Sequence, residues 1–411
     1  MLELTGRRQR LLVALVAFIV SAVATVLAGT TTTASPTTTS AAGRSPAAPA
    51  APSSPAAPSK AADPRKPLRI GIAYGDTLTW KNDQDLATGL GDAVNSGAKW
   101  VRVDLSWNDI QPDSSKTYEW QRFDRVFKAA QARGLEVLPT IGYAPKWARK
   151  TSCASDDACP PADPALFAAF AADAAKRYAP QGMHTWEVWN EPNIPFWAPA
   201  PDPAAYTQLL GDTSKALRAA DPQAFILMGG LAAVGTDPSI NYVSQGDFLT
   251  AVCKLGANKL VDAISYHPYT YPYLPSAKTT FGTAMEEISS APGNLVAILA
   301  SYGTPDLPIW ITETGAPTNG PGTATDGTDI TPQTTHVTPG FQAAIAADTI
   351  PAAAANPHVG AVFWFADQDS GPASDKQYRS EFYGLRSFDG TPKPALAALG
   401  KAITAYEQSK S

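Results

Sequence analysis

The sequence predicts an α/β fold, a closed (β/α)8 barrel, and two observations support this prediction. From residue 68 onward, short apolar runs typical of strands alternate with longer amphipathic runs of helical period, and the pair repeats eight times. Eight such units are the number that closes a parallel barrel. An open, doubly wound sheet is the alternative, but no glycine-rich phosphate loop follows the first apolar run.

Each predicted strand is followed by a predicted helix. The strands are expected at residues 68–75, 100–107, 135–142, 184–190, 224–231, 261–267, 307–313 and 359–366. The helices are expected at residues 85–97, 119–133, 164–179, 203–220, 246–258, 284–302, 339–355 and 394–407. Long connections follow four of the strands, at residues 143–163, 191–202, 314–338 and 367–390. In a barrel of this kind, such loops wall the functional cleft.

The first 28 residues are expected to be a signal peptide. Three arginines, at positions 7, 8 and 10, precede an apolar run over 11–28, and Val26 and Ala28 suit cleavage after Ala28. The run is nearly as long as the roughly 20 residues that span a bilayer, so an uncleaved anchor is the alternative. We therefore expect a secreted or extracellular protein, with any membrane attachment through this segment alone.

Two further regions follow. Residues 29–67 consist almost entirely of Ala, Ser, Thr and Pro, a composition that predicts a disordered linker. No second break of this kind divides residues 68–408, so one domain is expected there.

Clustered basic residues are lacking beyond residue 10 and the net charge is −5, which argues against nucleic acid as a partner. We expect a monomer.

Neither the cysteines nor the histidines of the chain point to a cofactor. Cys153 and Cys159 lie close together in a polar stretch and are expected to form a small disulfide loop in an exported protein. Cys253 lies among apolar residues of a helical pattern and is expected to be a buried thiol. The four histidines lack the spacing of a zinc site, so neither a metal nor another cofactor is expected.

Two glutamates carry the chemical prediction. Glu191 follows the run Trp186-Glu187-Val188-Trp189-Asn190, and Glu313 follows Ile309-Trp310-Ile311-Thr312. Each ends an apolar strand-like run and precedes turn-forming residues, so both are expected at the carboxyl ends of strands, where α/β barrels keep their reactive groups. A pair of carboxyl groups facing each other there is what the hydrolysis of a glycosidic bond requires.

Several motifs resemble the retaining glycoside hydrolases of clan A. They are Trp-Asn-Glu-Pro at 189–192, the seventh-strand Glu313, His267-Pro268-Tyr269 after the sixth strand, and the closing segment from Tyr383 to Pro394 after a strand that contains Trp364. The likeness spans the whole predicted barrel. Within the clan it is nearest to family 39, with family 5 as the competing family.

The resemblance implies a role for each matching residue. Glu191 would be the general acid/base, Glu313 the nucleophile, and Asn190 a hydrogen-bond partner of the sugar 2-hydroxyl. Arg102 would keep the nucleophile ionised. His267 and Tyr269 match polar sixth-strand residues, one of which orients the nucleophile, and Trp364 matches an aromatic floor of the sugar site.

Other polar and aromatic residues receive weaker predictions. Trp107 and Trp197 lie in or near the loops after strands, where flat rings can stack on sugars. Glu187 and Asp104 have the strand parity to face inward, but they precede the strand ends and are expected to be supporting polar groups below the site.

The sequence thus predicts a secreted, retaining β-glycoside hydrolase that uses two glutamates on a polysaccharide or oligosaccharide. An exo-acting β-glycosidase of the same clan is one alternative. A cell-surface barrel that binds glycan without cleaving it is the other.

Overall fold

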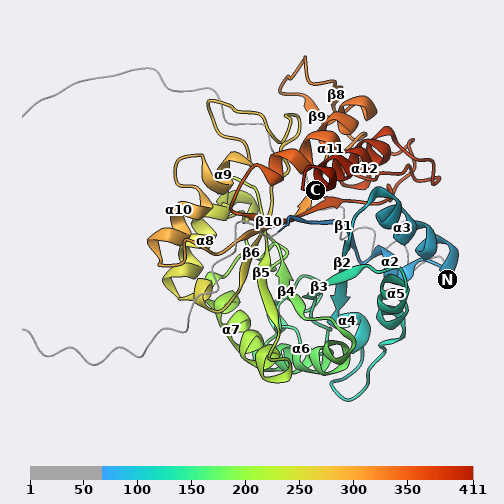
Figure 1. Ribbon diagram of the computed structural model, residues 1–411. Helices are drawn as coiled ribbons and strands as arrows, with labels where there is room; N and C mark the ends of the chain where they lie inside the picture. Colours follow the sequence, from blue (N-terminus) through green and yellow to red (C-terminus); the bar gives the residue numbers. More distant parts are fainter. Residues whose placement is uncertain (1–66, 411) are drawn as a thin grey trace, which may run out of the picture.

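Eight parallel strands close into a barrel in the order β1-β10-β7-β6-β5-β4-β3-β2, which confirms the predicted fold class (Figure 1). The computed structural model describes residues 67–410, so the predicted signal peptide and all but the last residue of the predicted linker lie outside the described residues. The barrel strands are β1 (Arg69–Gly75), β2 (Trp100–Ser106), β3 (Glu136–Gly142), β4 (Thr185–Asn190), β5 (Phe225–Ala232), β6 (Ala263–His267), β7 (Ile309–Thr314) and β10 (Val359–Phe365).

Helices surround the barrel in Figure 1. They are α2 (Thr77–Trp80), α3 (Asp83–Ser96), α4 (Trp107–Ile110), α5 (Gln121–Gln131), α6 (Pro164–Tyr178), α7 (Pro203–Ala220), α8 (Gln245–Lys254), α9 (Glu286–Ser289), α10 (Leu295–Ser301), α11 (Pro339–Ala354) and α12 (Pro394–Gln408). Capping side chains and prolines in the first turn determine where several of these helices begin. Asp202, for example, caps α7 by accepting hydrogen bonds from the Ala204 and Ala205 amides, and Pro203 occupies the first turn.

The short helices α2 and α4 were not predicted, and two predicted segments differ in the structure. The single helix expected over 284–302 is divided into α9 and α10, because Pro292 and Gly293, the latter with φ of 69°, interrupt it. The loop expected over 314–338 contains a small parallel sheet of β8 (Thr323–Thr325) and β9 (Thr334–Val337). This sheet lies at the periphery of the molecule, beside α11 (Figure 1).

The barrel has two apolar layers. The larger one packs the outward-facing strand residues against the helices and includes Val101, Val188 and Val362. The smaller one fills the barrel with Ala73, Leu138, Leu227, Ala263, Trp310, Ala361 and Phe363. Charged and polar residues on the same inward faces come next along β2, β4 and β6, so the interior changes from apolar to polar toward the carboxyl ends of the strands.

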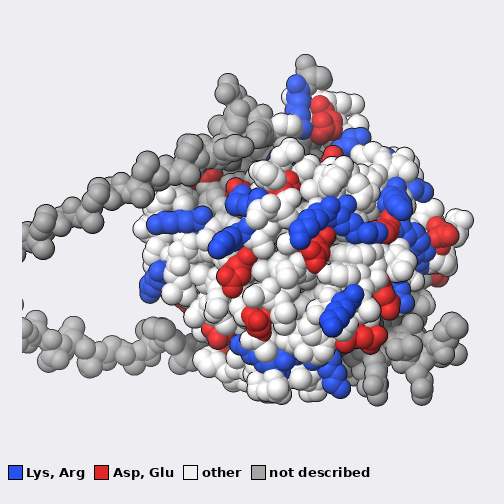
Figure 2. Space-filling view, turned by 90° about the horizontal axis from the view of Figure 1, so that it is seen from below, with Lys and Arg blue, Asp and Glu red and all other residues white. Residues whose placement is uncertain are grey.

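The described surface carries both signs of charge. On the face shown in Figure 2, Lys and Arg side chains are interspersed with Asp and Glu. Within residues 67–410, no helix combines the length and the apolar character needed to cross a membrane.

Candidate active site

The backbone around Glu191 is unusual for its residue types. Trp189 has φ of 73° and Glu191 has φ of 45°, a region that residues other than glycine rarely adopt. The Glu191 amide still donates a hydrogen bond to the Gly230 carbonyl of β5 at 2.8 Å, which ties the end of β4 to its neighbour. Glu191 is 2% exposed. The strained strand end fixes where the carboxyl group lies.

Arg102 connects β2 to three groups on β4 and β7. Its Nε donates to Glu187 Oε2 at 2.5 Å, its Nη1 to Glu313 Oε1 at 2.6 Å, and its Nη2 to Asn190 Oδ1 at 2.8 Å. The Tyr269 hydroxyl donates to the other Glu313 oxygen, Oε2, at 2.7 Å. Both oxygens of Glu313 therefore accept hydrogen bonds, one of them from a cation, and this arrangement stabilises the ionised form.

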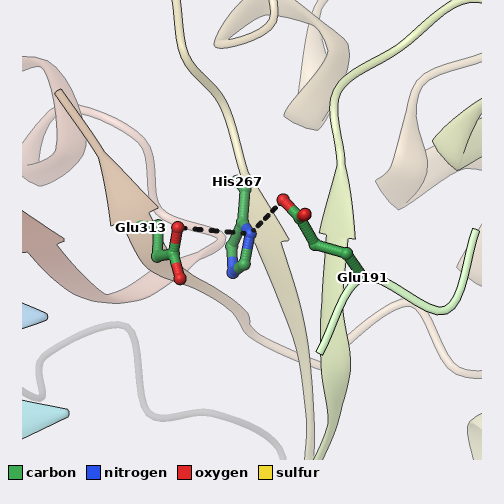
Figure 3. A group of neighbouring side chains, drawn as sticks. All are labelled: Glu191, His267 and Glu313. Atoms are coloured by element: carbon green, nitrogen blue, oxygen red, sulfur yellow. Dashed lines mark hydrogen bonds and ion pairs between the residues drawn. The ribbon is translucent and has the colours of Figure 1, made fainter. Parts of the chain in front are cut away.

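His267 joins the two glutamates (Figure 3). Its Nδ1 lies 2.8 Å from Glu191 Oε1 and 3.8 Å from Glu313 Oε2. Its Nε2 lies 3.0 Å from the Thr312 hydroxyl, which donates to Glu187 Oε1 at 3.0 Å. Among the described residues, Glu191 Oε2 is buried and has no hydrogen-bond partner. The surroundings of Glu191 thus provide less support for a negative charge than those of Glu313.

Burial and charge determine where the protons lie. Burial raises the pKa of Glu191, His267 opposes the rise, and Glu313 adds to it. Burial also raises the pKa of Glu313, while Arg102 and Tyr269 oppose that rise. Two buried carboxyl groups this close do not ionise independently, so the pair retains a proton to higher pH than an isolated Glu. We place that proton on Glu191, because Glu313 has the donors that stabilise an anion.

Glu187 is the ionised counterpart of Arg102. Burial alone would raise the pKa of Glu187, but Arg102, His267 and the Thr140 hydroxyl more than offset this and hold the pKa below its ordinary value. It is fully buried and its carboxylate accepts three hydrogen bonds, from Arg102, Thr140 and Thr312. As the sequence predicted, it supports the site from below.

A metal ion is chemically conceivable at one place in the described part of the chain. One oxygen each from Glu191 and Glu313 and one nitrogen of His267 lie within 4.8 Å of one another. His267 Nδ1 is already hydrogen-bonded to Glu191 Oε1 at 2.8 Å and lies 3.8 Å from Glu313 Oε2, so the geometry also suits proton transfer at Glu191 without an ion.

Three predicted sugar-stacking tryptophans do not reach the cavity, and these predictions were wrong. Trp364 is 1% exposed and belongs to the layer between strands and helices, because inward-facing positions on β10 are 361, 363 and 365. Trp107 is fully buried and stacks on Phe170. Trp197 is 2% exposed and packs edge-on against Trp189. All three stabilise the fold instead.

Other aromatic residues take their place. A cavity of about 160 Å³ opens beside Glu313 and Asn190. Its aromatic lining consists of Tyr143, Phe196, Tyr269, Phe365 and Tyr383. Phe365 is the inward-facing neighbour of Trp364, and the Phe365–Ala366 peptide is cis. Glu191 lies next to this cavity but is not part of its lining.

The cavity is walled by some of the predicted loops and by two that were not predicted. Loops 143–163, 191–202 and 367–390 contribute, whereas no described residue of 314–338 lines it. The segments after β1 and β2 contribute Asp76, Asn108 and Asp109 instead, and Asp104 lines the cavity rather than lying below it. Their Asp and Asn residues could not be predicted as cavity lining, because the same residue types are common in ordinary turns.

The structure contains the disulfide between Cys153 and Cys159. It closes a loop whose Asp157 and Ala158 line the cavity, and Asp157 pairs with Arg149 at 2.7 Å. Cys253 is buried and unpaired in α8, where burial raises the pKa of its thiol to about 11.

Comparison with known proteins identifies the family. The family model described as Cellulase (glycosyl hydrolase family 5) matches residues 66–366. The chain belongs to glycosyl hydrolase family 5. This is the competing family of the sequence prediction, and it lies in the predicted clan A.

Individual proteins are also similar to parts of the chain or to its fold. The chain is 26% identical over 231 residues to a β-xylosidase from Geobacillus stearothermophilus, covering 50% of this chain but only 42% of that enzyme. A family 39 glycoside hydrolase from Bacteroides cellulosilyticus WH2 is similar in fold, with a TM-score of 0.60, 24% identity, and coverage of 84% of this chain and 65% of that one. A GH5_18 enzyme from Streptomyces cattleya has a TM-score of 0.61 at 18% identity, covering 83% and 81%.

Proposed function

We propose that this family 5 protein is a retaining β-glycoside hydrolase in which Glu191 is the general acid/base and Glu313 the nucleophile. One observation carries the proposal: two buried glutamates whose oxygens lie within 4.8 Å have unlike surroundings. Arg102 and Tyr269 stabilise a charge on Glu313, whereas Glu191 has a buried oxygen without a partner. One acid and one anion are what the first step of double displacement requires.

In the first step, Glu313 attacks the anomeric carbon while Glu191 gives its proton to the glycosidic oxygen. The bond to the leaving group breaks, the leaving group departs as an alcohol, and the sugar becomes an ester of Glu313. Asn190 lines the cavity beside Glu313, and Arg102 fixes its side-chain oxygen. Its amide NH2 is thereby free to donate to a sugar hydroxyl, whose hydrogen bond strengthens as charge develops.

In the second step, the ionised Glu191 takes a proton from water, and the water oxygen attacks the anomeric carbon. The ester breaks, Glu313 regains its charge, and Glu191 regains its proton. Once Glu313 is esterified, its negative charge no longer raises the pKa of Glu191, so Glu191 can then act as a base.

The short separation of the two glutamates supports retention of configuration. Carboxyl groups of retaining enzymes lie about 5 to 5.5 Å apart, and those of inverting enzymes about 6.5 Å or more, because a water must fit between sugar and base. One oxygen of each glutamate lies within 4.8 Å of an oxygen of the other, a spacing that fits the retaining geometry better than the inverting one.

The proposed substrate is a β-linked glycan, with xylosides and mannosides among the first candidates. The curated relative is named a β-xylosidase, and one structural neighbour is named an exo-β-1,4-mannosidase. Endo action on a polysaccharide remains part of the proposal, with exo action as the competing possibility. The first products decide between them, because exo action releases only single sugars.

A panel of 4-nitrophenyl β-glycosides and β-glycans, with the anomer of the first product followed by proton NMR, tests the proposal. We expect a β product from a β substrate. An α product would establish inversion. Binding without turnover across the panel, with no change in Glu191→Gln, would favour the non-catalytic glycan-binding barrel.

We also propose that the protein is exported and acts outside the cell. This rests on the charged start and apolar run of residues 1–28 and on the disulfide, which suits an oxidising compartment. Amino-terminal sequencing of protein from the culture medium tests it. A new terminus at Gly29 is expected, and an intact terminus in the membrane fraction would identify the segment as an anchor.

A further inference from the structure

Asp104 lies one inward-facing position beyond Arg102 on β2. Val101, Val103 and Leu105 pack in the outer apolar layer, so Arg102, Asp104 and Ser106 face the barrel interior. Arg102 is 1% exposed and lies behind the site, whereas Asp104 is partly exposed and lines the same cavity as Glu313. A sugar beside Glu313 therefore meets the Asp104 carboxyl group.

Within residues 67–410, the side chain of Asp104 makes no hydrogen bond and no ion pair, and only its backbone is paired, with Thr140 of β3. The nearby guanidinium group of Arg102 is already used by Glu187, Glu313 and Asn190. A carboxyl group that faces a cavity with its hydrogen-bonding capacity unused is available to a ligand.

The charges around Asp104 determine its protonation. Burial raises its pKa to about 8; Arg102 opposes the rise, while Asp76, Glu313 and Glu187 add to it. Tyr143, which follows β3, lines the same cavity, and burial followed by the charge of Asp104 raises the pKa of that phenol. Near neutral pH, Asp104 therefore carries a proton and offers both a hydrogen-bond donor and an acceptor, as a sugar hydroxyl does.

The rest of the lining determines which sugars are compatible. Its carboxyl and guanidinium side chains are those of Asp76, Asp104, Asp109, Asp157, Glu313 and Arg149. Arg149 is the single cation among them, and it is paired with Asp157 at 2.7 Å. A sugar carboxylate placed here would face carboxyl groups without a free cation, which costs binding free energy.

We propose that Asp104 binds a hydroxyl group of the sugar next to Glu313, and that this subsite accepts uncharged sugars and excludes uronic acids. The inference rests on the proposed function, since it names the substrate class of the same site. It makes Asp104 a specificity-determining residue that contacts substrate.

The experiment compares wild type, Asp104→Ala and Asp104→Asn on the 4-nitrophenyl β-glycosides of xylose, glucose, mannose and galactose and on the β-glucuronide and β-galacturonide. We expect wild type to hydrolyse neutral glycosides alone. Asp104→Ala should lower kcat/KM by on the order of tenfold to 100-fold, because the hydroxyl loses its partner. Asp104→Asn should keep most activity below pH 7, because an amide also offers a donor and an acceptor.

The pH profile separates a binding role from a structural one. Above pH 8 the wild type should lose activity as Asp104 ionises beside Glu313, whereas Asp104→Asn should lose less over the same range. Asp85 is exposed on α3, and Asp85→Asn is the matched control. Its pH profile should be the same as that of the wild type. Thermal unfolding of each variant checks folding, and Asp104→Asn still decides the matter if Asp104→Ala does not fold.

Three results would overturn the inference: hydrolysis of uronides as fast as neutral glycosides, wild-type kinetics in Asp104→Ala, or equal damage in both Asp104 variants. Calorimetric titration of the same glycosides provides a readout without turnover. Neutral-sugar binding that Asp104→Ala weakens would support the subsite even if no glycoside were hydrolysed, and only the proposed function would then fail. If neither neutral sugars nor uronides bind, the subsite is refuted.

Discussion

Glu313 and Glu191 are both buried at strand ends, yet the structure supports them in different ways. Glu313 receives Arg102 on one oxygen and the Tyr269 hydroxyl on the other. Glu191 contacts His267 with one oxygen, and the other has no partner among the described residues. Burial raises the pKa of both, so the difference between an acid and an anion comes from the donors.

The difference shows how one barrel holds two identical side chains for opposite tasks. The groups that stabilise the anion come from β2 and from the segment after β6, whereas Glu191 is positioned chiefly by its own strained backbone at the end of β4. Changing a donor should therefore alter one glutamate more than the other, and four substitutions test this.

The largest effect is expected from Glu313→Ala. Without the nucleophile, kcat on an activated β-glycoside should fall by about 10⁴-fold or more. Azide should restore turnover by attacking from the vacated side, giving the glycosyl azide of inverted configuration. NMR of the azide product checks the result, and a product of retained configuration would mean that the two glutamates have been assigned the wrong way round.

The next effect is expected from Glu191→Ala. Loss of the general acid should lower kcat by about 10² to 10⁴-fold, with a smaller loss for substrates whose leaving group needs no proton. Because Glu191 must be protonated and burial raises its pKa, wild-type activity should fall as pH rises through that pKa. The variant should lack this alkaline limb. A pH profile identical to wild type would remove Glu191 from the acid role.

The fold was largely predictable from the sequence because strands and helices leave different periods. Six of the eight barrel strands lie inside their predicted ranges, and β5 and β7 each extend one residue beyond theirs. The division between α9 and α10 has a signal in the sequence, Pro292-Gly293, and this turn signal outweighs the helical period that predicts one long helix. The small β8–β9 sheet could not be predicted, because three- and four-residue strands are too short for a period to appear.

The positions of Glu191 and Glu313 could be predicted from sequence motifs, but the aromatic residues that line the cavity could not. The last barrel strand reads Val-Gly-Ala-Val-Phe-Trp-Phe and is covered on both faces, so the sequence does not show whether Trp364 or Phe365 faces inward. Trp107 illustrates a second limit. An aromatic residue just after a strand can face the cavity or the helices, and its packing on Phe170 of α6 is a long-range contact.

A smaller effect is expected from Tyr269→Phe, which removes one donor from Glu313 and keeps the ring. The pKa of Glu313 should rise, because its anion loses the hydroxyl hydrogen bond. The acidic limb of kcat/KM should then move to higher pH, with a loss on the order of tenfold at neutral pH. Tyr271→Phe is the matched control, since its hydroxyl contacts Tyr383 rather than Glu313. Equal shifts in both variants would contradict the proposed donor role.

The smallest effect is expected from Thr312→Val, which tests how His267 is oriented toward Glu191. The Thr312 hydroxyl donates to Glu187, so its oxygen accepts from His267 Nε2 and leaves Nδ1 facing Glu191. Valine removes that acceptor, and the alkaline limb assigned to Glu191 should shift with a few-fold loss of kcat. Thr312→Ser should restore it. Thr140→Val removes a hydrogen bond from the same Glu187 but leaves the contacts of His267 unchanged. The alkaline limb of this variant should therefore stay at the wild-type pH. If both valine variants shift the alkaline limb equally, the charge of Glu187 rather than the orientation of His267 sets the pKa of Glu191.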